Sequence, residues 1–187
     1  MAVGMGARVT IVDKSLDVLR RLDEQFGSRV QTLYSTQDSL ETAAMSADLI
    51  IGAVLIPGAS APKLVTADMV RQMKPGTVLV DVAIDQGGCF ETSHPTTHSK
   101  PTFMVDDVVH YCVANMPGAV ARTSSAALNN ATLPYVLQLA EKGVMRALRE
   151  NNYLLQGLNV YKGALTNEFV SSAHNMPFTE PEDAIAA

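Results

Sequence analysis

The chain has 187 residues, of which 47% are hydrophobic and 18% charged, and its net charge is −5. This composition predicts one folded domain, or one domain with a small addition, and excludes extensive disorder. The acidic balance argues against nucleic acid as the main partner, and the longest apolar run, 49–56, is too short to span a membrane. Two widely spaced cysteines and the lack of a secretion signal predict a cytoplasmic protein.

Short apolar runs alternate with helical patterns between residues 8 and 115. Ser15 is a candidate N-cap for the first helix, and Gly27 is its expected stop. The strand expected at 48–55 is continuously apolar after Asp48, which is typical of a strand that is buried on both faces. We expect strands at 8–13, 30–33, 48–55, 77–82, 102–105 and 108–113, and helices at 16–26, 38–45 and 66–73. This order predicts an α/β fold with a doubly wound parallel sheet.

The pattern changes after Pro117. Residues 124–140 have a long helical pattern that includes Pro134, where we expect a kink rather than a break. Further helices are expected at 144–150 and 166–174, followed by a polar tail from residue 177. We therefore place the boundary between the two parts of the chain near residue 120.

Two carboxylates lie at or just beyond the ends of predicted strands. In open α/β sheets, ligands bind beyond the carboxyl ends of the strands. Asp13 could accept hydrogen bonds from the adenosine ribose of a dinucleotide and favour NAD over NADP, or it could be a solvated acid beside Lys14. Asp85 is placed for chemistry, and the glycine pair Gly87 and Gly88 could approach a ligand or simply allow positive φ angles. An aspartate before glycines is also ordinary in turns.

Two further loops follow predicted strands. Val54 and Leu55 could form an apolar face for adenine or ribose, or could complete the core. Asn115 could orient a carboxamide, or could cap a turn.

The histidines and cysteines show no metal-binding spacing, so no metal site is predicted. Cys89 lies near Asp85, but no histidine base is identifiable beside it, which favours a packing role over a nucleophilic one. We interpret all four histidines as surface residues: His94, His98, His110 and His174.

Four segments resemble the C-terminal half of alanine dehydrogenases: 4–13, 51–64, 81–91 and 111–118. The resemblance extends over essentially the whole chain. Members of that family interconvert L-alanine with pyruvate and ammonia using NAD, and they usually form hexamers. The resemblance implies a partial NAD-binding domain of Rossmann type at 1–120. It also implies that the helices of 121–187 pack with the substrate domain.

The resemblance also implies roles for individual residues. Asp85 matches the active-site aspartate, which acts at the imine and carbinolamine stages. Asp13 matches the ribose ligand, and Ser35 matches a contact near the adenine. The other expected cofactor contacts are Val54, Leu55, Val82, Val113, Asn115 and Met116.

Parts of the family pattern would precede Met1, namely the glycine-rich phosphate loop, the first strand and the substrate domain with its cationic side chains. We therefore expect the 187 residues to be inactive alone. In a sheet ordered 3-2-1-4-5-6 the first strand is central, so without it both neighbouring strands have unpaired backbone. We predict that these strands rearrange, or that the missing strand comes from another chain or segment.

Two other functions are compatible with these motifs. The proton-translocating transhydrogenase subunit shares the Pro-Lys-Leu motif at 62–64 and the Gln-Gly-Gly motif at 86–88. That family carries glutamate before Gln-Gly-Gly, so Asp85 favours alanine dehydrogenase. A non-catalytic remnant would act only in subunit assembly, with the helix at 124–140 pairing with its equivalent in another subunit.

Overall fold

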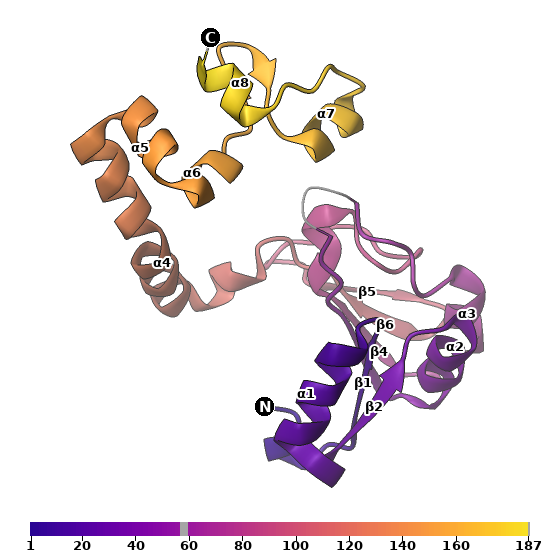
Figure 1. Ribbon diagram of the computed structural model, residues 1–187. Helices are drawn as coiled ribbons and strands as arrows, with labels where there is room; N and C mark the ends of the chain where they lie inside the picture. Colours follow the sequence, from indigo (N-terminus) through magenta and orange to yellow (C-terminus); the bar gives the residue numbers. More distant parts are fainter. Residues whose placement is uncertain (57–59, 187) are drawn as a thin grey trace. The chain divides into compact units, whose positions relative to one another are not determined.

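The computed structural model describes residues 1–56 and 60–186 and divides the chain into two compact units (Figure 1). The first unit comprises Met1–Val54 and Ala61–Ala114. The second comprises Leu55–Ser60 and Asn115–Ala187. A mixed α/β unit and a set of C-terminal helices confirm the predicted fold class.

The first unit begins with a parallel β-α-β motif. Strand β1 (Val9–Asp13) pairs with β2 (Val30–Tyr34), and helix α1 (Leu16–Phe26) connects them. Ser15 caps α1 through its side chain, and Gly27 follows its last residue with a φ of +55°. The predicted strand, cap, helix and stop are therefore confirmed. Short 3-10 turns precede the two strands: η1 (Val3–Met5) and η2 (Gly27–Arg29).

The second sheet of this unit has four strands in the order β3-β4-β6-β5. Strands β3, β4 and β6 are parallel, and the register aligns Gly52 with Asp81 and Val80 with Tyr111. These three strands therefore end at the same edge of the sheet. The bounds are β3 (Leu49–Gly52), β4 (Val78–Asp81), β5 (Thr102–Val105) and β6 (Val108–Tyr111).

Strand β5 departs from the predicted parallel arrangement, because it is antiparallel to β6. The connection between the two strands is only Asp106 and Asp107, which both have positive φ angles, of 49° and 60°. Two residues with positive φ form the tight turn that joins antiparallel strands, whereas a parallel pair requires a long crossover.

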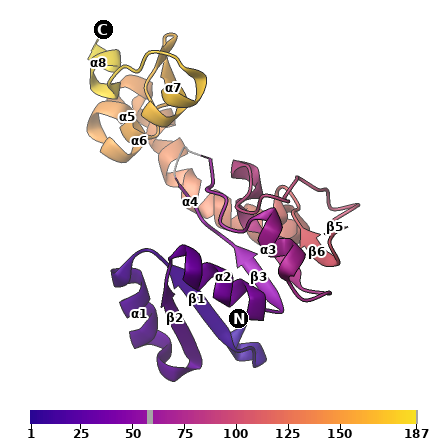
Figure 2. The same ribbon diagram turned by 90° about the vertical axis from the view of Figure 1, so that its right-hand side faces the viewer.

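Strand β3 is shorter and more exposed than its apolar sequence predicts. Leu49 is 52% exposed and Ile51 57% exposed, so the expectation of burial on both faces is wrong. Ile50, between them, packs against the buried cluster beneath α2 (Gln37–Ser46) and α3 (Ala67–Gln72). These two helices lie side by side in both views (Figure 2).

The two sheets are separate, and among residues 1–56 and 60–186 no strand pairs with both β1 and β3. In the predicted order these strands flank the central position. They do not pair with each other, so the chain does not close the gap by direct rearrangement. The prediction that another chain or segment supplies a strand there stays open.

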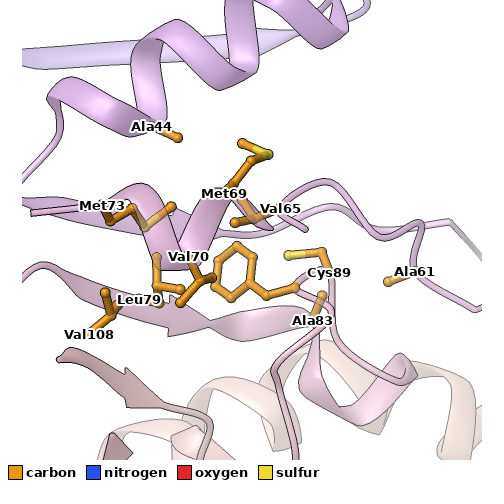
Figure 3. Packing of buried hydrophobic residues seen from close by; sticks show 11 residues of the cluster. Ala44, Ala61, Val65, Met69, Val70, Met73, Leu79, Ala83, Cys89 and Val108 are labelled. Carbon is orange, nitrogen blue, oxygen red and sulfur yellow. The ribbon is translucent and has the colours of Figure 1, made fainter. Parts of the chain in front are cut away.

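A hydrophobic core joins α2 and α3 to the four-stranded sheet (Figure 3). Val70 and Leu79 are fully buried where α3 meets β4. The segment after β4 contributes the fully buried Cys89 and Phe90. The same core therefore holds both the sheet and the loop that carries the predicted site. Further members are Ala44, Ala61, Val65, Met69, Met73, Ala83 and Val108.

The second unit is mainly helical. Its longest helix, α4 (Ala121–Lys142), continues through Pro134 and has no buried residue. Helix α5 (Val144–Glu150) has the predicted bounds. The remaining elements are η4 (Met116–Val120), α6 (Asn152–Gln156), β7 (Val160–Tyr161), β8 (Ala164–Leu165), α7 (Glu168–His174) and α8 (Pro181–Ala186).

The prediction of a polar tail after residue 177 is wrong. Helix α8 forms there and buries Ala184 and Ile185, and Ile185 packs with Leu148 and Leu155 in a second small core. Apolar contacts with α5 and α6 therefore stabilise a helix that begins with the exposed residues Glu182 and Asp183.

In the part of the chain that the structure describes, no helix is both long and apolar enough to cross a membrane.

Candidate functional site

The predicted site lies where β4 reaches the carboxyl edge of its sheet. The strand ends at Asp81 and continues into the 3-10 turn η3 (Val82–Gln86). Asp85 is exposed on this turn, and Val82 is 49% exposed. The turn ends in Gly87 and Gly88, whose φ angles are +89° and +74°. A carboxylate that can meet a ligand is thus placed directly after a buried strand.

Asp81 is a second carboxylate, and it is fully buried beneath this turn. Its Oδ2 accepts hydrogen bonds from Ser93 Oγ at 2.6 Å and from the Cys89 amide at 3.0 Å. The Phe90 amide donates to the same oxygen at 3.4 Å. These donors compensate for the loss of water around a buried charge. Sequence reasoning missed this role, although an acid inside an apolar strand was the available signal.

Lys63 holds the same loop from its carbonyl side. Its Nζ donates to the carbonyl oxygens of Gly87 at 2.6 Å, Gly88 at 2.9 Å and Phe90 at 3.2 Å. The Pro-Lys-Leu motif at 62–64 stands out in the sequence. Nothing in the motif indicated that the partners of Lys63 would be backbone oxygens.

The two cysteines are buried thiols. Burial, with a further contribution from the Asp81 carboxylate, raises the pKa of the Cys89 thiol to about 12. Burial also raises the pKa of Cys112. Cys89 is fully buried in the hydrophobic core, so the packing role predicted for it is confirmed. A thiol that stays protonated is also a poor nucleophile.

His110 is a core residue, and its predicted surface position is wrong. It is fully buried, with Nε2 2.7 Å from Thr92 Oγ1 and Nδ1 3.0 Å from the Val108 carbonyl oxygen. Its ring stacks on Phe103, which in turn stacks on His94. Desolvation lowers the pKa of His110 from its ordinary value of 6.5.

The carboxyl ends of β1 and β2 bring Asp13 and Ser35 together. The Ser35 amide donates to the Asp13 carbonyl oxygen at 2.9 Å. Asp13 Oδ1 accepts a hydrogen bond from the Ser15 amide at 2.7 Å, which fixes the orientation of the carboxylate. Among the described residues, no group donates to Asp13 Oδ2. A half-buried carboxylate with one unused oxygen fits a ribose hydroxyl as its partner.

The other predicted contacts differ in exposure. Val54 is half-buried two residues after the end of β3, and Val113 is fully buried just after β6. Leu55 is 72% exposed and belongs to the second unit. Asn115 and Met116 also belong to that unit, and Asn115 has a left-handed backbone with a φ of +56°.

Across residues 1–56 and 60–186, no group of three or more His, Cys, Asp or Glu side chains could hold a metal ion.

The model of the family described as "Alanine dehydrogenase/PNT, C-terminal domain" matches residues 1–168. The chain belongs to this family. An alanine dehydrogenase from Halomonas elongata is 59% identical over 185 residues, which cover 99% of this chain and 50% of that protein. One from Mycolicibacterium smegmatis is 55% identical over 186 residues, with coverage of 100% and 50%. The chain therefore spans about half the length of these relatives.

Solved structures give the same relationship. An L-alanine dehydrogenase matches with a TM-score of 0.83 and 53% identity, covering 94% of this chain and 48% of that one. A transhydrogenase from Sinorhizobium meliloti matches with a TM-score of 0.57 and 29% identity, covering 67% and 35%. The resemblance to alanine dehydrogenases is thus confirmed, and with it a lineage of NAD-dependent dehydrogenases.

Proposed function

We propose that this chain forms the NAD-binding half of an alanine dehydrogenase, which oxidatively deaminates L-alanine to pyruvate and ammonia. The observation that carries the proposal is the exposed Asp85, which follows β4 at the carboxyl edge shared with β3 and β6. That edge is where ligands of open α/β sheets bind. The names of relatives 55–59% identical to this chain support the choice of reaction.

Asp13 and Ser35 would hold the adenosine end of NAD. The free Oδ2 of Asp13 would accept a hydrogen bond from a ribose hydroxyl, and its negative charge would disfavour a 2′-phosphate. Val54, Leu55 and Val82 would supply apolar contacts to the cofactor. The segment with Val113, Asn115 and Met116 would lie beside the nicotinamide. When bound, NAD supplies the acceptor for the hydride from the α-carbon of alanine.

Asp85 would handle protons at the reacting carbon. Water must add to the iminium carbon of the oxidised substrate before ammonia can leave. Asp85 would take a proton from that water and return one to the departing nitrogen. The exposure of Asp85 allows a substrate to approach. The buried Asp81 stays hydrogen-bonded to the loop at 89–93.

The two parts of the chain would serve different purposes. We propose that 1–120 is a partial NAD-binding domain and that the helices of 121–187 pack with the substrate domain. We also propose that the protein forms a homo-oligomer. The absence of any buried residue along the 22 residues of α4 supports a partner surface there.

Calorimetric titration of NAD and NADH into the 187-residue chain, with L-alanine turnover assayed alongside, tests the proposal. We expect micromolar NADH binding without turnover, because the resemblance places the substrate-binding cations outside these residues. Asp13→Asn should weaken binding, whereas Asp23→Asn, at an exposed position on α1, should not. Absence of NADH binding would contradict the proposal, and self-association without binding would favour the assembly role.

A further inference from the structure

The peptide unit that joins Gly88 to Cys89 is held at its two ends by opposite charges. The Gly88 oxygen accepts a hydrogen bond from Lys63 Nζ at 2.9 Å. The amide of the same unit, Cys89 N–H, donates to Asp81 Oδ2 at 3.0 Å. A peptide group carries partial negative charge on its oxygen and partial positive charge on its N–H. Both side chains therefore stabilise the same orientation of this one peptide plane.

Lys63 is fully committed to this loop. A lysine ammonium has three N–H donors and no acceptor. Lys63 has three carbonyl partners, the oxygens of Gly87, Gly88 and Phe90, at 2.6 to 3.2 Å. In this arrangement it has no donor left for a substrate carboxylate or a phosphate. Its contribution is therefore to the shape of the loop.

Asp81 holds the amide groups of the loop and requires glycine at position 88. Besides the Cys89 amide, its Oδ2 accepts from the Phe90 amide at 3.4 Å and from Ser93 Oγ at 2.6 Å. A Cβ atom at Gly88 would lie 2.7 Å from this oxygen, and Gly88 also has a φ of +74°. Only glycine lets the backbone approach the buried carboxylate this closely.

The clamped segment is directly connected to the turn that carries Asp85. The Gly87 amide donates to the Ile84 oxygen and the Gly88 amide to the Ala83 oxygen, each at 3.0 Å. These bonds close the end of η3 around Asp85. A change in the backbone of Gly87 or Gly88 would therefore be transmitted to the position of Asp85.

We propose that Lys63 and Asp81 are positioning residues, which together set the place of Asp85 at the carboxyl edge of the sheet. The purpose of that positioning rests on the proposed function, but the clamp itself does not. This role requires no contact between either side chain and the substrate. They act on Asp85 through the backbone of residues 87–90.

The test compares Lys63→Met with Lys74→Met in the 187-residue chain. Methionine keeps much of the lysine stem and removes the charge. Lys74 is a matched control, because its Nζ bonds a single backbone oxygen, that of Ser46, at 3.1 Å and lies 3.8 Å from an Asp48 carboxylate oxygen. Three readouts are needed: amide hydrogen exchange across 87–93, the 13C signal of the Asp85 carboxyl group, and calorimetric NADH binding. Lys63→Arg, which restores a cationic donor, is the second variant.

We expect Lys63→Met to accelerate exchange at Cys89 and Phe90 by about tenfold or more, as the loss of hydrogen bonds to a charged group implies. It should also shift the Asp85 carboxyl signal, and Lys63→Arg should largely restore both. Lys74→Met should change neither. Unchanged exchange or an unchanged Asp85 signal in Lys63→Met would overturn the clamp. If wild-type chain shows the clamp but binds no NADH, the proposed function fails while the positioning role stands.

Discussion

Gly52 packs directly against Cys89, with no space between them for a side chain. A Cβ atom at position 52 would overlap Cys89 Sγ and would lie 2.7 Å from Cζ of Phe90. Gly52 is the last residue of β3, in register with Asp81. Because residue 52 has no side chain, the loop segment with Cys89 and Phe90 can pack directly against the end of β3.

Gly52→Ala should consequently destabilise the chain by about 1–3 kcal/mol, the usual cost of overpacking a core. Urea unfolding monitored by circular dichroism measures this change. Gly4→Ala is the control, because nothing lies within 4 Å of a Cβ atom there and its φ is not positive. An equal effect of the two substitutions would show that the contact with Cys89 is not the cause.

The thiols should resist modification in the folded chain. Cys89 and Cys112 are both fully buried, and the pKa of Cys89 is raised to about 12. Because the thiolate is the reactive form, we expect negligible labelling by a chromogenic disulfide reagent at pH 8. Both thiols should react in urea. Rapid labelling of either cysteine under native conditions would contradict their placement in the core.

Stability should fall as the pH drops below about 6.5, partly because of His110. Desolvation lowers its pKa in the folded chain, so the unfolded chain takes up a proton at a higher pH than the folded chain does. Protonation therefore favours unfolding in the window below the unfolded value of 6.5. The measurement is the free energy of unfolding from pH 7.5 to pH 5.

His110→Gln should flatten this pH dependence, since glutamine does not titrate. His174→Gln, at an exposed position, should leave it unchanged. If both variants keep the wild-type slope, the pH dependence comes from other groups.

The unpaired edges of β1 and β3 predict an unusual pattern of amide hydrogen exchange. Within the described residues, β1 pairs only with β2, and β3 pairs only with β4. Amides of β1 and β3 that point away from these partners should exchange at nearly unprotected rates, while those that point toward them should be slow. Protection on both edges would show that another strand, from a second copy or another segment, fills the central position.

The sequence predicted those features of the fold that depend on local signals. The N-cap at Ser15 and the stop at Gly27 are set by residues next to the helix they bound. The run before Asp13 is β-branched, and such residues favour strands in many contexts. These elements were therefore confirmed nearly residue by residue.

Features that depend on distant partners were harder to predict. Exposure of Leu49 and Ile51 depends on the elements next to β3, not on the residues themselves. Helix α8 has the exposed acids Glu182 and Asp183 in its first turn and is stabilised by contacts of Ile185 with α5 and α6. His110 is buried because Thr92 and the Val108 carbonyl satisfy its ring nitrogens.

The candidate site shows the same division. Asp13 and Asp85 were recognisable because each follows an apolar run and leads into a turn. Lys63 and Asp81 were missed because their partners lie in a loop more than seven residues away along the chain. Only the folded chain brings those atoms to the two side chains.

The most direct test of the account is to map NADH binding onto the chain by NMR. Amide resonances of an isotopically labelled sample would be followed during titration with NADH. We predict shifts concentrated at Asp13, Ser35, Val54 and Val82, the residues at the carboxyl ends of β1 to β4. Shifts confined to other surfaces, or none at millimolar NADH, would contradict a cofactor site at this edge.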